Sequence, residues 1–208
     1  MVVWCDACFA LKQTCFARLL HIEMNQTIEV FRPIDPKVRI GHVHLKVADI
    51  ERALDFYCGV LGFELTQRLG DSAAFIAAGG YHHHIALNTW ESLGGEPPPF
   101  GTTGLYHLAI LYPNRATLAD ALCRLIRADI PLEGASDHGV SESLYLRDPD
   151  DNGVELYCDR PQDEWTYTAD GKLAMFTRQL NLRNLLNETA MGSQIESPSQ
   201  PESELRDP

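Results

Sequence analysis

Three residues with metal-binding side chains, His42, His107 and Glu155, occupy related places in the sequence. The two histidines lie at equivalent points of two similar segments, and the glutamate follows in a later apolar segment. Two imidazoles and one carboxylate can bind a metal ion and leave other coordination positions free for small molecules. A single strand histidine is more often simply hydrogen-bonded, but the equivalence of His42 and His107 favours a metal site.

The two similar segments must position these side chains. They read IGHVHLKVADIERALDFYCGVLG (residues 40–62) and LYHLAILYPNRATLADALCRLIRAD (residues 105–129). Each predicts a short strand with a histidine, a turn and an amphipathic helix, capped by Asp49 in the first and Asn114 in the second. The apolar stripes of the two helices are Ile50, Ala53, Leu54, Tyr57 and Leu61, and Leu118, Ala121, Leu122, Leu125 and Ile126.

Short strands are predicted after each helix. They are FELTQRL, SAAFIAA and HHHIALN in the first half and, beyond a turn at Pro131, SLYLRD and GVELYC in the second. The fold class is therefore α+β, with two βαβββ modules at about residues 38–90 and 103–162 in one domain, residues 38–162. The connecting ESLGGEPPPFGTTG is rich in Gly and Pro, as a linker or rim loop should be.

Alternation along the strands separates the residues that face the helices from those that face a site. The residues expected to face the helices are Val43, Leu45, Val47, Tyr106, Leu108, Ile110, Val154 and Leu156. His42, His107 and Glu155 therefore belong to the opposite, polar faces.

Composition limits the class of partner. The 208 residues are 45% hydrophobic and 22% charged, and the net charge is -12, which disfavours nucleic acid and anionic membranes and favours a small-molecule partner. The N-terminal stretch is interrupted by Asp6, Lys12 and Arg18 and predicts neither a signal peptide nor a membrane span. Of the six cysteines, three lie in one short N-terminal stretch and three are scattered, which indicates reduced thiols and a cytoplasmic protein; no second pair completes a zinc site with Cys5 and Cys8.

The two ends of the chain are expected to lie outside the domain. Residues 1–37 form an N-terminal extension, and one hypothesis is that translation starts at Met24. Residues 163–188 form a C-terminal segment in which Lys172 to Glu188 favours a helix. Residues 189–208 are rich in Ser, Pro and Glu and are predicted to be a disordered tail.

From about Ile40 to Arg160 the chain resembles the vicinal oxygen chelate superfamily, which includes glyoxalase I, fosfomycin resistance enzymes, bleomycin resistance proteins and type I extradiol dioxygenases. This resemblance implies that the two modules form a cupped mixed sheet around a metal site. The stretch HGVSESLYLRDPDDNGVE, from His138 to Glu155, follows the extradiol ring-cleavage signature. It departs at Asp151, where the signature has Gly or Pro, and Ser136 departs at the first position of the signature.

The resemblance assigns roles by position. His42, His107 and Glu155 would bind Fe(II), with Mn(II) as the alternative. His138 would hydrogen-bond the dioxygen-derived ligand, and Tyr145 the bound catecholate.

A catalytic base is implied by the segment YHHHIALN, which resembles the extradiol segment that accepts the proton of the catechol hydroxyl. Alignment of its HHxIA portion selects His83. Strand alternation leaves the choice open, because it places His82 and His84 on one face and His83 on the other.

The implied activity is extradiol cleavage of a catechol-like diol with dioxygen, by a homodimer that closes the cup. One alternative is a glyoxalase-like isomerase or lyase, although glyoxalase I uses a fourth ligand, a glutamate, on the strand that reads HHHIALNT here. A fosfomycin-type thiol transferase would share the triad but would not explain the spacing of His138 and Tyr145. A binding protein like the bleomycin resistance proteins would not need the triad.

Overall fold

The computed structural model describes residues 32–189 and divides the chain into two parts, residues 1–40 and residues 41–208. In the first part, Val38 N donates to Asp35 O at 3.0 Å and closes a turn. The Cys5–Cys8 pair, the hypothesis on Met24, most of the N-terminal extension and nearly all of the predicted tail lie outside the described residues. None of the helices found in residues 32–189 could span a lipid bilayer. Cys58, Cys123 and Cys158 are free thiols.

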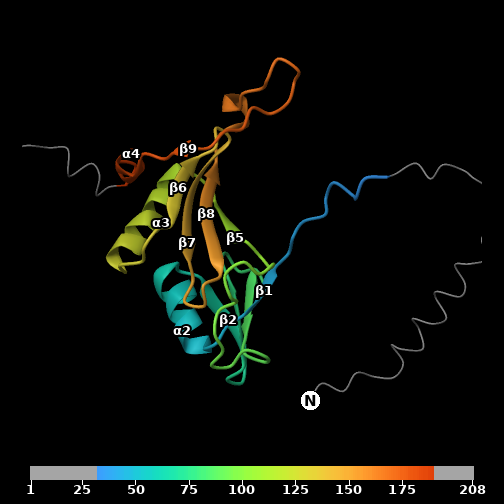
Figure 1. Cartoon of the computed structure of the whole chain (residues 1–208), viewed down its shortest axis with the longest axis vertical. Coiled ribbons are helices and arrows are strands. Elements are labelled where there is room, and N and C mark those ends of the chain that lie inside the picture. The colour runs from blue at the N-terminus through green and yellow to red at the C-terminus, as the bar shows by residue number, and fades with distance from the viewer. Residues whose placement is uncertain (1–31, 190–208) are drawn as a thin grey trace, which may run out of the picture. The chain divides into compact units, whose positions relative to one another are not determined.

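The first module is a four-stranded sheet with one helical crossover (Figure 1). Its strands are β1 (Val43–Lys46), β2 (Glu64–Leu69), β3 (Ala73–Ala77) and β4 (Ile85–Asn88), in the order β1-β4-β3-β2. β1 and β4 run parallel, and the other pairs are antiparallel. Between β1 and β2 lie α2 (Ile50–Leu54) and a π-helical turn, Asp55–Val60.

The second module repeats this topology. It contains β5 (Leu108–Tyr112), α3 (Arg115–Arg127), β6 (Gly134–Asp137), β7 (Ser141–Arg147) and β8 (Gly153–Asp159), and the sheet order is β5-β8-β7-β6-β9. β9 (Arg178–Gln179) is added at the edge by the C-terminal segment. The predicted fold class and the βαβββ duplication are confirmed, and the strands form two sheets, one for each module.

Local sequence signals begin and end the helices. The Asp49 side chain accepts from Arg52 N at 3.0 Å, and the Asn114 side chain accepts from Thr117 N at 3.0 Å. These bonds satisfy backbone donors that a first helical turn leaves free. The first helix is closed by Gly62 at φ +89°, a conformation in which glycine avoids the cost of a side chain.

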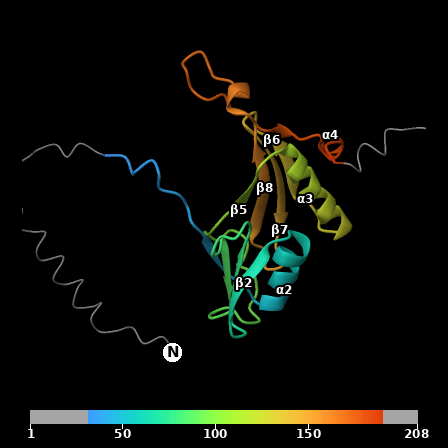
Figure 2. The ribbon, with the colours of Figure 1, turned by 180° about the vertical axis from the view of Figure 1, so that it is seen from behind.

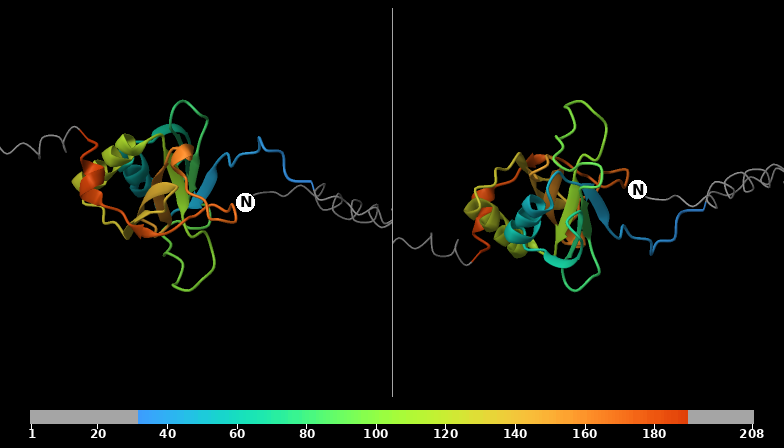
Figure 3. Two further views of the ribbon diagram at one scale, coloured as in Figure 1. Left: turned by 90° about the horizontal axis from the view of Figure 1, so that it is seen from above. Right: turned by 90° about the horizontal axis from the view of Figure 1, so that it is seen from below.

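One hydrophobic core joins both modules, and it lies between the helices and the sheets. Figure 2 shows α3 alongside the second sheet, and the end-on views of Figure 3 show α2 and α3 on the same side of the sheets. Leu118, Leu122 and Leu125 of α3 are essentially inaccessible to solvent. The helical stripes are therefore as predicted, with one exception.

Two predicted helix-facing residues are exposed. Ile126 is 58% exposed because it lies one position beyond Leu125, at the rim of the stripe in the last turn of α3. Tyr106 is 80% exposed because β5 begins only at Leu108, so strand alternation does not extend back to it. Both predictions were wrong for the same reason, since each residue lies at an end of its element.

The C-terminal segment contains less helix than its sequence favoured. It comprises a 3₁₀ turn (Gln162–Glu164), β9 and the short α4 (Leu182–Leu186), which contacts α3. The part of the predicted helix from Lys172 to Gln179 is not helical: Leu173 forms an isolated bridge with Tyr167, and Arg178 and Gln179 pair with the edge of β6.

The turn between β7 and β8 joins the two modules. Asp150 Oδ1 accepts from Ala48 N at 2.9 Å and from Arg52 Nη2 at 2.6 Å. Asp148 Oδ2 accepts from the Tyr57 hydroxyl at 2.9 Å, and both aspartates are buried. Burial, and then the Asp148 carboxylate, raise the pKa of Tyr57 above its ordinary 10.0, so the phenol stays a hydrogen-bond donor.

We predict that Tyr57→Phe lowers the free energy of unfolding by about 1 to 3 kcal/mol, because the charged Asp148 loses one of its donors in the interior. Since folding holds the Tyr57 proton above its ordinary pKa, wild-type stability falls as pH rises above about 10, and the variant should show a shallower fall. Urea unfolding at pH 8 and pH 10.5 measures both effects. Tyr167→Phe, at a residue 57% exposed, is the control and should match wild type.

We predict that Leu122→Ala costs about 2 to 5 kcal/mol, because Leu122 is 1% exposed and its truncation leaves a cavity. Ile126→Ala, in the same helix, should change stability by less than about 0.5 kcal/mol. Urea unfolding of the two variants checks the boundary of the buried stripe. Equal losses would contradict it.

Candidate active site

In the second module, His107 and Glu155 meet across neighbouring parallel strands. His107 immediately precedes β5, Glu155 lies in β8, and His107 Nε2 is 2.9 Å from Glu155 Oε2. The Glu155 side chain is 13% exposed and that of His107 is 31% exposed, so the pair is shielded but reachable from solvent. Two of the three predicted ligands are thus in contact through the atoms that would bind a metal.

Gly153 allows this approach, and sequence reasoning missed it. A Cβ at Gly153 would lie 2.1 Å from the Tyr106 carbonyl oxygen and 3.0 Å from the His107 Cβ. Any larger residue at this first position of β8 would displace the backbone of Tyr106 and His107. The glycine directly before an apolar strand was the available sequence signal, since an isolated strand glycine often marks close backbone approach.

Tyr145 and His138 lie beside the pair. Tyr145 of β7 is directly opposite Glu155 of β8, and its ring centroid is 5.9 Å from that of His107. The Tyr145 hydroxyl is 2.8 Å from His138 Nε2. Burial is the main cause that raises the pKa of Tyr145, which keeps the phenol protonated at neutral pH.

Asp151, which departs from the ring-cleavage signature, adopts φ +64°. Aspartate tolerates this left-handed conformation better than most residues. The turn is further held by Asp148 Oδ1, which accepts from Asp150 N at 2.9 Å and Asn152 N at 2.8 Å. The substitution is accommodated within the turn, and the pairing of Tyr145 with Glu155 is kept.

In the first module, His42 immediately precedes β1, as His107 precedes β5. Its ring centroid lies 4.5 Å from that of His83. Partial burial, and then the neighbouring imidazoles, lower the pKa of His83 and favour its neutral form.

The three consecutive histidines precede β4 and do not belong to it, contrary to the predicted strand HHHIALN. Strand alternation therefore does not apply to them. His83 Nδ1 is 2.8 Å from His82 Nδ1, whereas His84 Nδ1 accepts from Ala78 N at 3.3 Å. Of the three rings, His83 is the one in contact with His42.

The structure does not bring the predicted ligands into one group. Among residues 32–189, no three His, Cys, Asp or Glu side chains are arranged to hold a metal ion. His107 contacts Glu155, while His42 contacts His83. The donor types suit Fe(II) or Mn(II), and two of the three already converge.

Two hollows lie near these residues. One, of about 200 Å³, is lined by His107 and Tyr145, with Arg147 among its other residues. The other, of about 460 Å³, lies between β1 and the Pro-rich linker and includes His44 and Asp150. His44 Nε2 is 2.8 Å from Asn88 Nδ2, so this histidine is tied to the sheet.

The chain is similar to curated proteins of one superfamily. It is 41% identical over 155 residues to the catechol-2,3-dioxygenase of Bacillus subtilis, a match that covers 74% of this chain and 53% of that protein. It is 34% identical over 139 residues to biphenyl-2,3-diol 1,2-dioxygenase 2 of Rhodococcus globerulus, covering 64% and 70%. The lactoylglutathione lyase of Escherichia coli O157:H7 is 26% identical over 128 residues, covering 57% and 91%. The chain spans about half the length of the Bacillus relative.

Comparison with solved structures supports the same fold. A glyoxalase/dioxygenase structure from Nostoc punctiforme superposes with a TM-score of 0.51 at 21% identity, covering 64% of this chain and 99% of that one. The family model of the Glyoxalase/Bleomycin resistance protein/Dioxygenase superfamily matches residues 39–156, which include both modules up to β8. By its duplicated fold and by this match, the chain belongs to the Glyoxalase/Bleomycin resistance protein/Dioxygenase superfamily.

Proposed function

We propose that this protein is a metal-dependent extradiol dioxygenase, which cleaves a catechol-like aromatic diol with dioxygen. The observation that carries the proposal is the contact of His107 with Glu155, with Tyr145 and His138 hydrogen-bonded to each other beside it. Similarity to two proteins named as dioxygenases of aromatic diols supports it. The stretch from His138 to Glu155 resembles the ring-cleavage signature, which supports the proposal further.

The metal ligands would be His42, His107 and Glu155, with Fe(II) as the ion and Mn(II) as the alternative. The close contact of His107 Nε2 with Glu155 Oε2, at 2.9 Å, joins the two atoms that would otherwise face the ion. A bound divalent ion would supply acidity to the diol hydroxyls and a common centre for diol and dioxygen. The protein residues supply placement and proton handling.

His83 would be the base. It contacts His42, and its lowered pKa keeps a free ring nitrogen available near neutral pH. A neutral imidazole can accept the proton of a diol hydroxyl. Tyr145 would orient the diol through its hydroxyl, and His138 holds that hydroxyl through Nε2.

A glyoxalase-like activity with four protein ligands is less well supported. In the second module Glu155 is paired with Ala109, the second residue of β5. The corresponding pair in the first module is His44 with Ala86, so alanine occupies the place of a fourth carboxylate. The dioxygenase proposal needs no ligand there.

The surroundings of the reaction are also proposed. Phe100, Leu105 and Tyr106 are strongly exposed near the second module, as expected if another copy covers them in a homodimer. The three described cysteines are free, in keeping with a reducing cytoplasm.

Anaerobic reconstitution with Fe(II), followed by oxygen uptake on a panel of catechols, tests the proposal. We expect stoichiometric oxygen consumption and a yellow ring-fission product with at least one catechol. Formation of lactoylglutathione from methylglyoxal and glutathione serves as the competing assay. No uptake with any catechol, together with lyase activity, would overturn the proposal.

We predict that His107→Ala abolishes stoichiometric Fe(II) binding, because it removes one of three ligands. Metal analysis after anaerobic loading and desalting measures this. His44→Ala is the matched control, since His44 is bonded to Asn88 and should not be needed for the ion. Full iron content and activity in His107→Ala would contradict the ligand assignment.

We predict that His83→Ala retains iron but lowers kcat by roughly 10²-fold to 10⁴-fold, the usual contribution of a positioned base. His84→Ala is the control, because its ring is bonded to the Ala78 backbone and should affect turnover much less. If His84→Ala is the more damaging change, the base has been assigned to the wrong histidine.

A further inference from the structure

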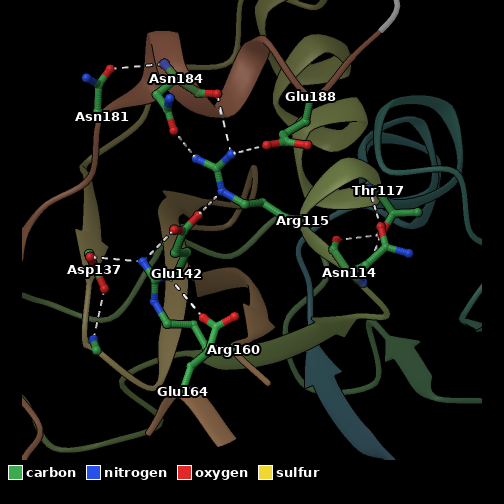
Figure 4. A network of polar contacts seen from close by, with 11 residues as sticks. Asn114, Arg115, Thr117, Asp137, Glu142, Arg160, Glu164, Asn181, Asn184 and Glu188 are labelled. Carbon is green, nitrogen blue, oxygen red and sulfur yellow. Dashed lines mark hydrogen bonds and ion pairs between the residues drawn. The ribbon is translucent and has the colours of Figure 1, made fainter. Parts of the chain in front are cut away.

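The C-terminal segment is fixed to the second module by an ion network around the buried Glu142 (Figure 4). Glu142 of β7, which is 4% exposed, accepts from Arg115 Nε and from Arg160 Nη2, both at 2.7 Å. Arg115 also donates to Asn184 Oδ1 at 2.8 Å and to Glu188 Oε1 at 2.6 Å. A carboxylate buried between two guanidinium groups holds its partners firmly, so α4 is anchored. This segment lies beyond the residues matched by the family model.

Upstream of α4, the same segment lies against the loop that carries His138. Arg178 of β9 pairs with Asp137 of β6, and Phe176 N donates to the His138 carbonyl at 3.2 Å. The Phe176 ring covers Gly139 so closely that a Cβ there would lie 2.6 Å from it. The Arg178 guanidinium lies 4.2 Å from the centroid of the same ring. The Phe176 ring therefore contacts both Gly139 and Arg178.

His138 is hydrogen-bonded through both ring nitrogens. Nδ1 is 3.1 Å from the Phe176 carbonyl oxygen, and Nε2 is 2.8 Å from the Tyr145 hydroxyl. A carbonyl oxygen only accepts, so in the neutral imidazole Nδ1 must carry the hydrogen and Nε2 must be bare. The Tyr145 hydroxyl is then the donor to Nε2. The Thr177 hydroxyl, 3.3 Å from Nδ1, can donate or accept and does not discriminate.

We infer that the C-terminal segment from Phe176 to Glu188 is a positioning element, which fixes His138 in the Nδ1–H tautomer through the Phe176 carbonyl. The catalytic meaning of this inference rests on the proposed function, since it presents a bare Nε2 beside Tyr145. The tautomer itself follows from the hydrogen bonds alone. Phe176 is the positioning residue, acting through His138.

Nitrogen-15 NMR of the metal-free full chain, labelled at histidine rings, reads the tautomer without any need for activity. We expect the His138 resonances, assigned by their loss in His138→Gln, to be those of Nδ1–H, the less common form of free histidine. Resonances of Nε2–H at His138 would overturn the inference.

Variants test the cause. Phe176→Ala removes the ring that seats the segment on Gly139, and should shift His138 toward Nε2–H. On the Fe(II)-loaded enzyme it should lower kcat by roughly 10-fold to 100-fold, as loss of an orienting partner does, with KM and iron content little changed. Met175→Ala, at a neighbouring residue 61% exposed, is the control and should leave the tautomer unchanged. Unchanged tautomer in Phe176→Ala would overturn the role of the segment.

Thr177→Val separates the carbonyl from the hydroxyl, and should keep the Nδ1–H form. Loss of that form would show the hydroxyl to be the determinant and overturn the assignment to the carbonyl. The two proposals also fail separately. The expected tautomers without turnover of any catechol would sink the proposed function alone, whereas turnover with an Nε2–H His138 would sink only this inference.

Discussion

The buried turn between β7 and β8 is the constraint on which the rest of the arrangement depends. Asp148 accepts a hydrogen bond from the Tyr57 hydroxyl, and Asp150 accepts from Ala48 N and from Arg52. Carboxylates of the second module are therefore bonded to residues in and around α2 of the first module. Buried carboxylates are costly unless they are hydrogen-bonded, and both oxygens of Asp148 and Oδ1 of Asp150 accept hydrogen bonds, which makes the docking of the two modules specific. The same turn sets where β7 ends and where β8 starts, and therefore how Tyr145 and Glu155 are paired.

The docking of the two modules through this turn divides the candidate site into two halves, one in each module. One half, His107 with Glu155 and Tyr145, is organised within the second sheet, and His138 is tied to it by a hydrogen bond. The other half, His42 with His83, lies next to the start of β1 in the first sheet. A duplicated module explains why each half has a histidine immediately before its first strand. Only the second carries a carboxylate on the partner strand, because Ala86 replaces it in the first.

Much of this could be predicted from the sequence, because period and capping are local properties. Helix caps at Asp49 and Asn114 and the buried faces of the strands follow from side-chain chemistry and alternation. The errors on buried faces lie at element ends, as with Tyr106 and Ile126, because the apolar residues of the sequence continue beyond the part of the element that is buried. The positions of the three histidines before β4 were also missed, since β-branched residues and alternation do not mark where a loop enters a strand.

Long-range contacts could not be predicted from one sequence. Nothing local in Asp150 indicates that it binds Arg52, and nothing in Phe176 indicates that its carbonyl meets His138. The close approach at Gly153 likewise depends on a strand distant in the chain. These contacts arise from the docking of elements, and they decide the geometry of the site.

We propose that one metal ion is bound jointly by both modules. The structure of the Fe(II)-loaded protein, with the ion located by its anomalous scattering, tests this most directly. We expect a single iron bound by His42, His107 and Glu155, with the direct His107–Glu155 contact replaced by bonds to the ion. Iron bound without His42, or at another group of residues, would contradict it.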